Sequence, residues 1–168
     1  MDLRVQRQRK GRRRWIVIVV VLAALVWGMN TVMISRPVAA ALAADERAAG
    51  IGFTAHLRYF LDPSTLSLDL ARMQVADTAD LFRGLLLAAG ALDRSAWPFR
   101  GFVLSRAGDP VYSIPGSDLY QLAHDYALSR KPAAVLAMLL TKLRLAGSQG
   151  AAPATVEAAA RLWATGRP

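Results

Sequence analysis

The chain has 168 residues, of which 54% are hydrophobic, and this is enough for one modest folded domain and an appendage rather than a disordered polymer. It has no cysteine, which excludes disulfides, thiolate metal sites and cysteine nucleophiles. The formal net charge is +9, but seven of the 21 basic residues and one of the 12 acidic residues lie in the first 14 positions. Because the excess belongs to a tail without interleaved aromatic residues, we expect no nucleic-acid partner.

The segment 15–35 is predicted to be a single transmembrane signal-anchor helix. Residues 15–34 carry no charge, and a helix of this length spans about 30 Å, the thickness of a hydrocarbon core. The basic tail over 1–14 precedes it, so the positive-inside rule places the amino terminus in the cytoplasm. The tail is also expected to contact anionic lipid. It consists of Arg4, Arg7, Arg9, Lys10, Arg12, Arg13 and Arg14.

A stripe of small residues runs along one side of this segment. Ala24, Gly28, Thr31 and Ser35 are spaced by four, three and four residues, and Asn30 lies beside them. Such stripes let a second helix approach closely, although Ala and Gly also align by chance. The stripe predicts a contact with another membrane protein, or a homo-oligomer formed through this helix.

The alanine-rich stretch 36–50 follows and has two interpretations. Pro37 is suited to the first turn of a helix, and the alanines would extend that helix to Gly50 as a connector. Alternatively, Ala41 and Ala43 before Ala44 fit a signal-peptidase site, and cleavage there would release a soluble protein. Secretory apolar cores usually have about 7–15 residues, so the longer segment here favours a retained anchor.

The exported domain is assigned to 51–147 and begins with a strand. Apolar and polar residues alternate over 51–59, which predicts a strand with one buried face. Residues 66–75 are ambiguous, because Leu66, Leu68 and Leu70 alternate as in a strand, whereas Asp62 and Pro63 could open a helix. We favour a helix there.

The next elements have clearer signals. Helical spacing over 77–90 predicts a helix that Asp77 or Thr78 caps and that Gly90 ends. The segments 99–105 and 111–114 predict a hairpin around a tight turn at 107–109. Prolines at both ends of its second strand suggest a short strand at a sheet edge, where a partner strand could add.

Three helices complete the chain. One runs over 117–131, capped by Ser117 or Asp118, and another over 132–147. The stretch 132–140 is apolar nearly all round, which favours a central core helix over a subunit interface. A linker and a carboxy-terminal amphipathic helix occupy 148–168, the helix running over about 153–164. The predicted fold is therefore a small α+β domain with two to three antiparallel strands and four to five helices.

Groups that could carry chemistry are sparse. The chain has two histidines, His56 and His124, without the spacing of metal ligands. Hydrolase and phosphate-binding motifs are missing, so we expect no cofactor, no metal and no catalysis. A weak polar cleft could form from Arg58, Arg100, Asp118 and His124 if the fold brings them together.

These observations predict a location and a role. The arginine- and alanine-rich composition suggests a bacterium, and the expected location is its inner membrane, with the domain in the periplasm. The expected role is that of a non-catalytic accessory, assembly or interaction subunit of a cell-envelope membrane complex. The alternative is a tethered or released periplasmic ligand-binding domain or enzyme.

Overall fold

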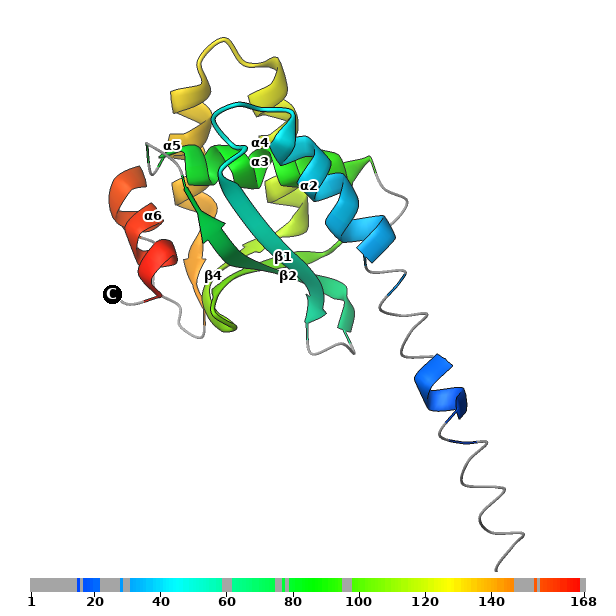
Figure 1. Ribbon diagram of the computed structural model, residues 1–168. Coiled ribbons are helices and arrows are strands. Elements are labelled where there is room, and N and C mark those ends of the chain that lie inside the picture. Colours follow the sequence, from blue (N-terminus) through cyan, green and yellow to red (C-terminus); the bar gives the residue numbers. More distant parts are fainter. Residues whose placement is uncertain are drawn as a thin grey trace, which may run out of the picture.

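The computed structural model describes residues 15, 17–21, 28, 31–58, 62–74, 77, 79–94, 98–146, 153 and 155–166. In this part of the chain, a mixed sheet packs with six helices (Figure 1). The helices are the π-helix η1 (Thr31–Ser35), α2 (Arg36–Ala43), α3 (Ala79–Asp93), α4 (Gly116–Leu128), α5 (Pro132–Lys142) and α6 (Val156–Thr165). The strands are β1 (Ile51–Arg58), β2 (Asp62–Met73), β3 (Gly101–Arg106), β4 (Asp109–Pro115) and β5 (Arg144–Leu145).

The five strands follow the order β1-β2-β3-β4-β5. Strands β2 and β3 are parallel, and α3 forms the crossover between them, whereas the other neighbours are antiparallel. The α+β class is therefore confirmed. The expected count of two to three antiparallel strands and four to five helices is wrong, because the described residues contain five strands, one parallel pair and six helices.

The largest difference between the predicted and the observed secondary structure is in β2. The preferred helix over 66–75 is wrong, because residues 62–73 form a long strand between β1 and β3. Leu66, Leu68 and Leu70 are each at most 1% exposed, and their period of two matches a strand with one face against the core. Pairing with two neighbours satisfies the backbone of β2 on both sides, which no local signal reveals.

The predicted transmembrane signal-anchor over 15–35 is contradicted. Among the described residues, no helix is both long and apolar enough to cross a membrane. The end of this segment forms η1, which leads directly into α2, and Ile34 packs in the domain core with Val38 and Leu42. The helical stretch formed by η1 and α2 also contains a charged residue, Arg36. Further towards the amino terminus, residues 17–21 are helical and exposed.

The alanine-rich connector is a shorter helix than expected. Pro37 lies in the first turn of α2, as predicted, but the helix ends at Ala43 rather than near Gly50. The chain then turns, because the Asp45 carboxylate accepts hydrogen bonds from the backbone N–H groups of Arg47 and Ala48, at 3.1 and 3.2 Å. This turn leads the chain directly into β1.

The other predicted elements are largely confirmed. Asp77 accepts a hydrogen bond from the backbone N–H of Ala79 at the start of α3, at 2.9 Å, whereas Thr78 lies outside the described residues. The helix continues past Gly90 to Asp93, since Ala91 and Leu92 extend its buried face. Helix α4 begins without a side-chain cap, so the capping predicted for Ser117 or Asp118 is wrong. Strand β4 is not at the sheet edge, because Tyr112 and Ser113 pair with β5.

One hydrophobic core joins the helices to one face of the sheet. It contains side chains of α2 to α6 together with the inward positions of the strands, for example Leu68, Leu104 and Tyr112. Trp163 of α6 is fully buried, stacks on Phe53 with ring centroids 5.5 Å apart, and donates from Nε1 to the Ser105 carbonyl at 3.0 Å. The carboxy-terminal helix is therefore an integral part of this core.

Candidate functional site

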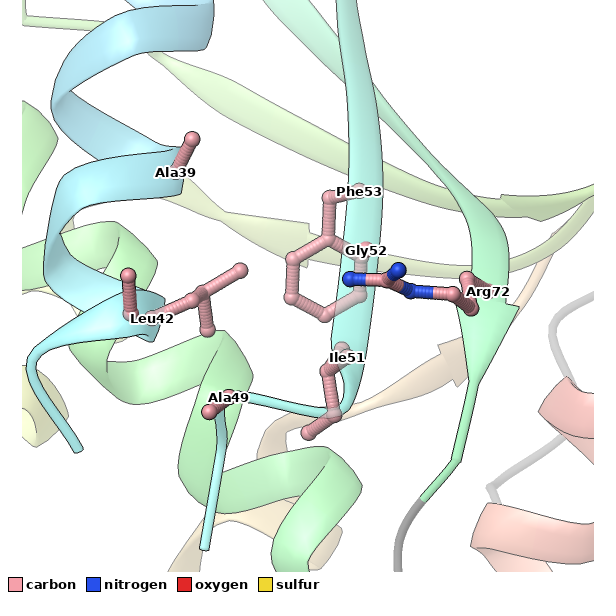
Figure 2. Close-up of a pocket in the computed structure, with 8 residues that line it drawn as sticks. Ala39, Leu42, Ala49, Ile51, Gly52, Phe53 and Arg72 are labelled. Atoms are coloured by element: carbon pink, nitrogen blue, oxygen red, sulfur yellow. The ribbon is translucent and has the colours of Figure 1, made fainter. Parts of the chain in front are cut away.

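A groove lies between α2 and β1, with a volume of about 170 Å³ (Figure 2). We name it the Arg72 groove, after the cation beside it. Its walls come from three places: α2, the turn before β1, and the paired ends of β1 and β2. The lining residues are Ala39, Leu42, Ala43, Ala49, Ile51, Gly52, Phe53 and Arg72.

Small residues create the space. Ala39 and Ala43 are exposed and lie one helical turn apart, so the side of α2 that borders the groove is shallow. Leu42 and Ile51 are both buried and anchor the apolar walls to the core. Gly52 pairs with Arg72 across the two strands, and a β-bulge follows between Gly52 and Phe53.

Arg72 extends across the position that a larger side chain would occupy at Gly52. A Cβ built at Gly52 would lie 3.3 Å from the Arg72 Cβ and 3.9 Å from its Nε. Figure 2 shows the guanidinium in front of Gly52 and Phe53, directed towards α2. A positively charged, planar group therefore borders a groove whose other lining side chains are apolar.

Two arginines near this region differ in their partners. Arg83 of α3 is bound to Asp45, with its Nε 3.2 and 3.1 Å from the two carboxylate oxygens. Among the described residues, Arg72 has no carboxylate or hydrogen-bond partner, and its side chain is exposed. Its guanidinium is available for a planar anion, which it can bind through two parallel N–H donors.

A second surface is formed by the α4–α5 hairpin, which projects from the body of the domain (Figure 1). We define the α4–α5 surface by Leu128, Arg130, Lys131, Ala134 and Met138, all of which are exposed. Leu128 is 72% exposed and Met138 is 52% exposed. Among the described residues after Met33, no other large hydrophobic side chain is so exposed.

Helix α5 is consequently not the central core helix that its composition suggested. It buries only Val135 and Leu139 fully, which lie one turn apart on the same side of the helix. The rest of its surface presents alanines and Met138 to solvent. The helix lies at the periphery because α3 already fills the centre of the core.

The predicted polar cleft is not brought together around one point. Asp118 contacts Lys142 of α5, with Oδ1 and Nζ 3.5 Å apart. His124 is exposed on α4, and six residues of helix place it about 120° around the axis from Asp118. Arg100 is exposed at the loop before β3, where its backbone N–H donates to the Ser64 carbonyl. The side chain of Arg58 lies outside the described residues.

Most of the predicted helix-contact and lipid residues lie outside the described part of the chain. Ala24, Asn30 and the basic residues of the tail lie outside the described residues. Gly28 lies in a helix, and no atom lies within 4 Å of the position that a Cβ would take there. Thr31 and Ser35 both belong to η1.

His56 lies opposite Ser67 on the sheet, and no group of three potential metal ligands forms within the part of the chain that is described.

The sequence does not identify the Arg72 groove as a site, and it gives a subunit interface over 132–140, which is part of the α4–α5 surface, only as the alternative to a core helix. The alanines of α2 were interpreted as helix formers, and Arg72 stood in a segment interpreted as helical. For the groove, the available signal was Gly52 within an alternating strand, since such a glycine often marks a bulge or a close approach. No protein-family model, curated protein or solved structure matches this chain significantly.

Proposed function

We propose that this domain is a non-catalytic interaction module that binds another protein through the α4–α5 surface, as an accessory or assembly subunit of a cell-envelope complex. The observation that carries the proposal is the exposure of Leu128 and Met138, because the other described large apolar side chains after Met33 are buried or partly buried. Exposed apolar anchors of this kind are typical of protein interfaces.

The chemistry of the surface indicates the kind of partner. Arg130 and Lys131 lie in the turn beside Leu128, and both are exposed. Neither has an ion-pair partner among the described residues. A partner segment with apolar residues at its centre and acidic residues at its rim would complement this arrangement, since rim charges steer association and select partners.

Site-specific photo-crosslinking of the full chain in its native cells tests the proposal. A benzoylphenylalanine at Leu128 is expected to give one dominant crosslinked protein, whereas the same group at Gln121, an exposed position of α4, gives none. Reversing both charges with Arg130→Glu and Lys131→Glu is expected to reduce the crosslink several-fold. Equal crosslinking at both positions, or no effect of the charge reversal, would refute the proposal.

The periplasmic location remains a separate prediction. Cleavage of the domain by protease added to spheroplasts, with a cytoplasmic marker intact, would support it. Protection of the domain until the cells are lysed would count against both the location and the envelope complex.

A further inference from the structure

We infer that the Arg72 groove is a binding site for a small branched aliphatic carboxylate. This inference concerns a second site, formed by α2, β1 and β2, and is independent of the α4–α5 surface. It rests on three features: the size of the groove, the apolar side chains that line it, and a guanidinium that has no partner among the described residues.

The size of the groove limits the ligand to a short aliphatic group. An apolar cavity of about 150 Å³ binds benzene, which has six non-hydrogen atoms, so a volume of about 170 Å³ suits a group of roughly that size. Leu42 of α2 and Ile51 and Phe53 of β1 line the groove, and the small side chain of Ala39 leaves the side along α2 shallow. A branched chain of four or five carbon atoms fits this space, whereas a fused ring system is too large.

The charge of the groove selects the polar end of the ligand. Among the described residues that line it, Arg72 carries the one charged side chain, and its planar guanidinium matches a carboxylate through two parallel hydrogen bonds. A phosphate dianion would need further donors, and the remaining lining side chains are alanine, leucine, isoleucine and phenylalanine. The carboxylate is therefore expected at the mouth, with the aliphatic group inside.

A neighbouring acid does not compete for Arg72. Asp45 lies in the same turn as Ala49, which lines the groove, but its carboxylate is bound by Arg83 and by two backbone N–H groups. This arrangement engages the Asp45 carboxylate, which therefore does not pair with Arg72.

The test uses 4-methylpentanoate as the probe and its neutral counterpart, 4-methylpentanamide, as the control. Backbone amide shifts of the full chain are recorded during titration with each compound. We expect saturable shifts at Gly52, Phe53 and Ala39 with the acid, and binding at least tenfold weaker with the amide. No saturable shift with the acid, or equal binding of the acid and the amide, would overturn the inference.

Three variants localise the binding. Arg72→Gln is expected to weaken binding of the acid at least tenfold and to leave binding of the amide unchanged. Arg100→Gln, at an exposed arginine elsewhere, is expected to change the binding of neither compound. Ala39→Leu fills the groove from an exposed position and is expected to abolish binding of both compounds. Unchanged acid binding in Arg72→Gln or in Ala39→Leu would place the site elsewhere.

The same chemical group also occurs at the carboxyl terminus of a polypeptide. N-acetyl-alanyl-leucine, which ends in a leucine carboxylate, distinguishes the two sources. If this dipeptide binds more weakly than 4-methylpentanoate, the small-molecule assignment holds. If it binds at least tenfold more tightly, the groove recognises a peptide terminus and the assignment is wrong.

Discussion

Arg83 and Asp45 form a two-point ion pair that fastens α3 to the turn between α2 and β1. Both side chains are largely covered, at 27% and 19% exposure, and the Arg83 guanidinium also lies 6.0 Å from the centre of the Tyr126 ring. The pair therefore connects the turn after α2 with α3 and α4. It fixes the turn that forms one end of the Arg72 groove.

Replacing Asp45 should destabilise the domain in a pH-dependent way. The hydrogen bond from Arg83, more than any other contact, lowers the pKa of Asp45 below its ordinary value of 3.8. Because the folded-state pKa is lowered, the stabilisation is fully present above the unfolded pKa and is lost as pH falls through the folded pKa. We expect Asp45→Asn to unfold in urea with about 1–2 kcal/mol less free energy at pH 7.

The matched control for this prediction is Asp118→Asn, which removes the more exposed pair with Lys142 and should cost less than about 1 kcal/mol. The difference in unfolding free energy between wild type and Asp45→Asn, measured in urea, should become smaller below pH 3.8. A constant difference down to pH 2 would show that the ion pair is not its source.

The hydroxyl group of Tyr112 is expected to titrate at unusually high pH. Burial raises its pKa to about 12, and the hydroxyl donates to the Ala159 carbonyl of α6 at 3.1 Å. Since the folded pKa is raised, this contribution to stability is complete below the ordinary pKa of 10.0 and is lost as pH rises towards 12.

Tyrosinate absorbance measures this directly. Burial raises the pKa of both Tyr112 and Tyr120, and the component at about pH 12 should be missing in Tyr112→Phe. The variant should also lose about 1 kcal/mol of unfolding free energy at pH 7, because the Ala159 carbonyl loses its partner. Titration of Tyr112 together with exposed tyrosines would contradict the buried placement.

A glycine at position 107 should stabilise the β3–β4 turn. Ala107 and Gly108 have positive φ values of 53° and 86°, and their N–H groups donate to the Asp69 carboxylate at 3.0 and 2.6 Å. The left-handed conformation costs alanine about 1 kcal/mol but is readily adopted by glycine. Ala107→Gly should therefore raise the unfolding free energy by about 0.5–1 kcal/mol.

The control for this substitution is Ala137→Gly on the exposed side of α5. There the same change should lower stability by about 1 kcal/mol, because glycine is unfavourable within a helix. Chemical unfolding of both variants checks the pair. Destabilisation by Ala107→Gly would mean that residue 107 does not hold this conformation in solution.

A chain that starts at Ala44 should be severely destabilised. Such a chain, which cleavage at the possible signal-peptidase site would produce, lacks Ile34, Val38 and Leu42, which are 7%, 1% and 3% exposed in the core. Each buried side chain of this type contributes about 1.5–3 kcal/mol. We expect the shortened chain to lose cooperative thermal unfolding, whereas a chain that starts at Thr31 retains it. Wild-type stability in the shortened chain would mean that α2 is dispensable.

The sequence predicted the elements whose signals are local. The alternation in β1, the helical spacing and Asp77 cap of α3, and the turn residues of the β3–β4 hairpin each identify their element, because neighbours in the chain decide these conformations. The amphipathic pattern of α6 likewise predicted a helix with Trp163 on its apolar side.

The tertiary structure alone decided the elements and sites that depend on distant contacts. Leu66, Leu68 and Leu70 fit a strand as well as a helix, and pairing with β1 and β3 selects the strand, because hydrogen-bond partners far along the chain satisfy its backbone. The same holds for the surface of the molecule. The position of the Arg72 guanidinium beside Gly52 and the exposed side of α5 depend on which faces pack together, and periodicity within a segment does not determine this.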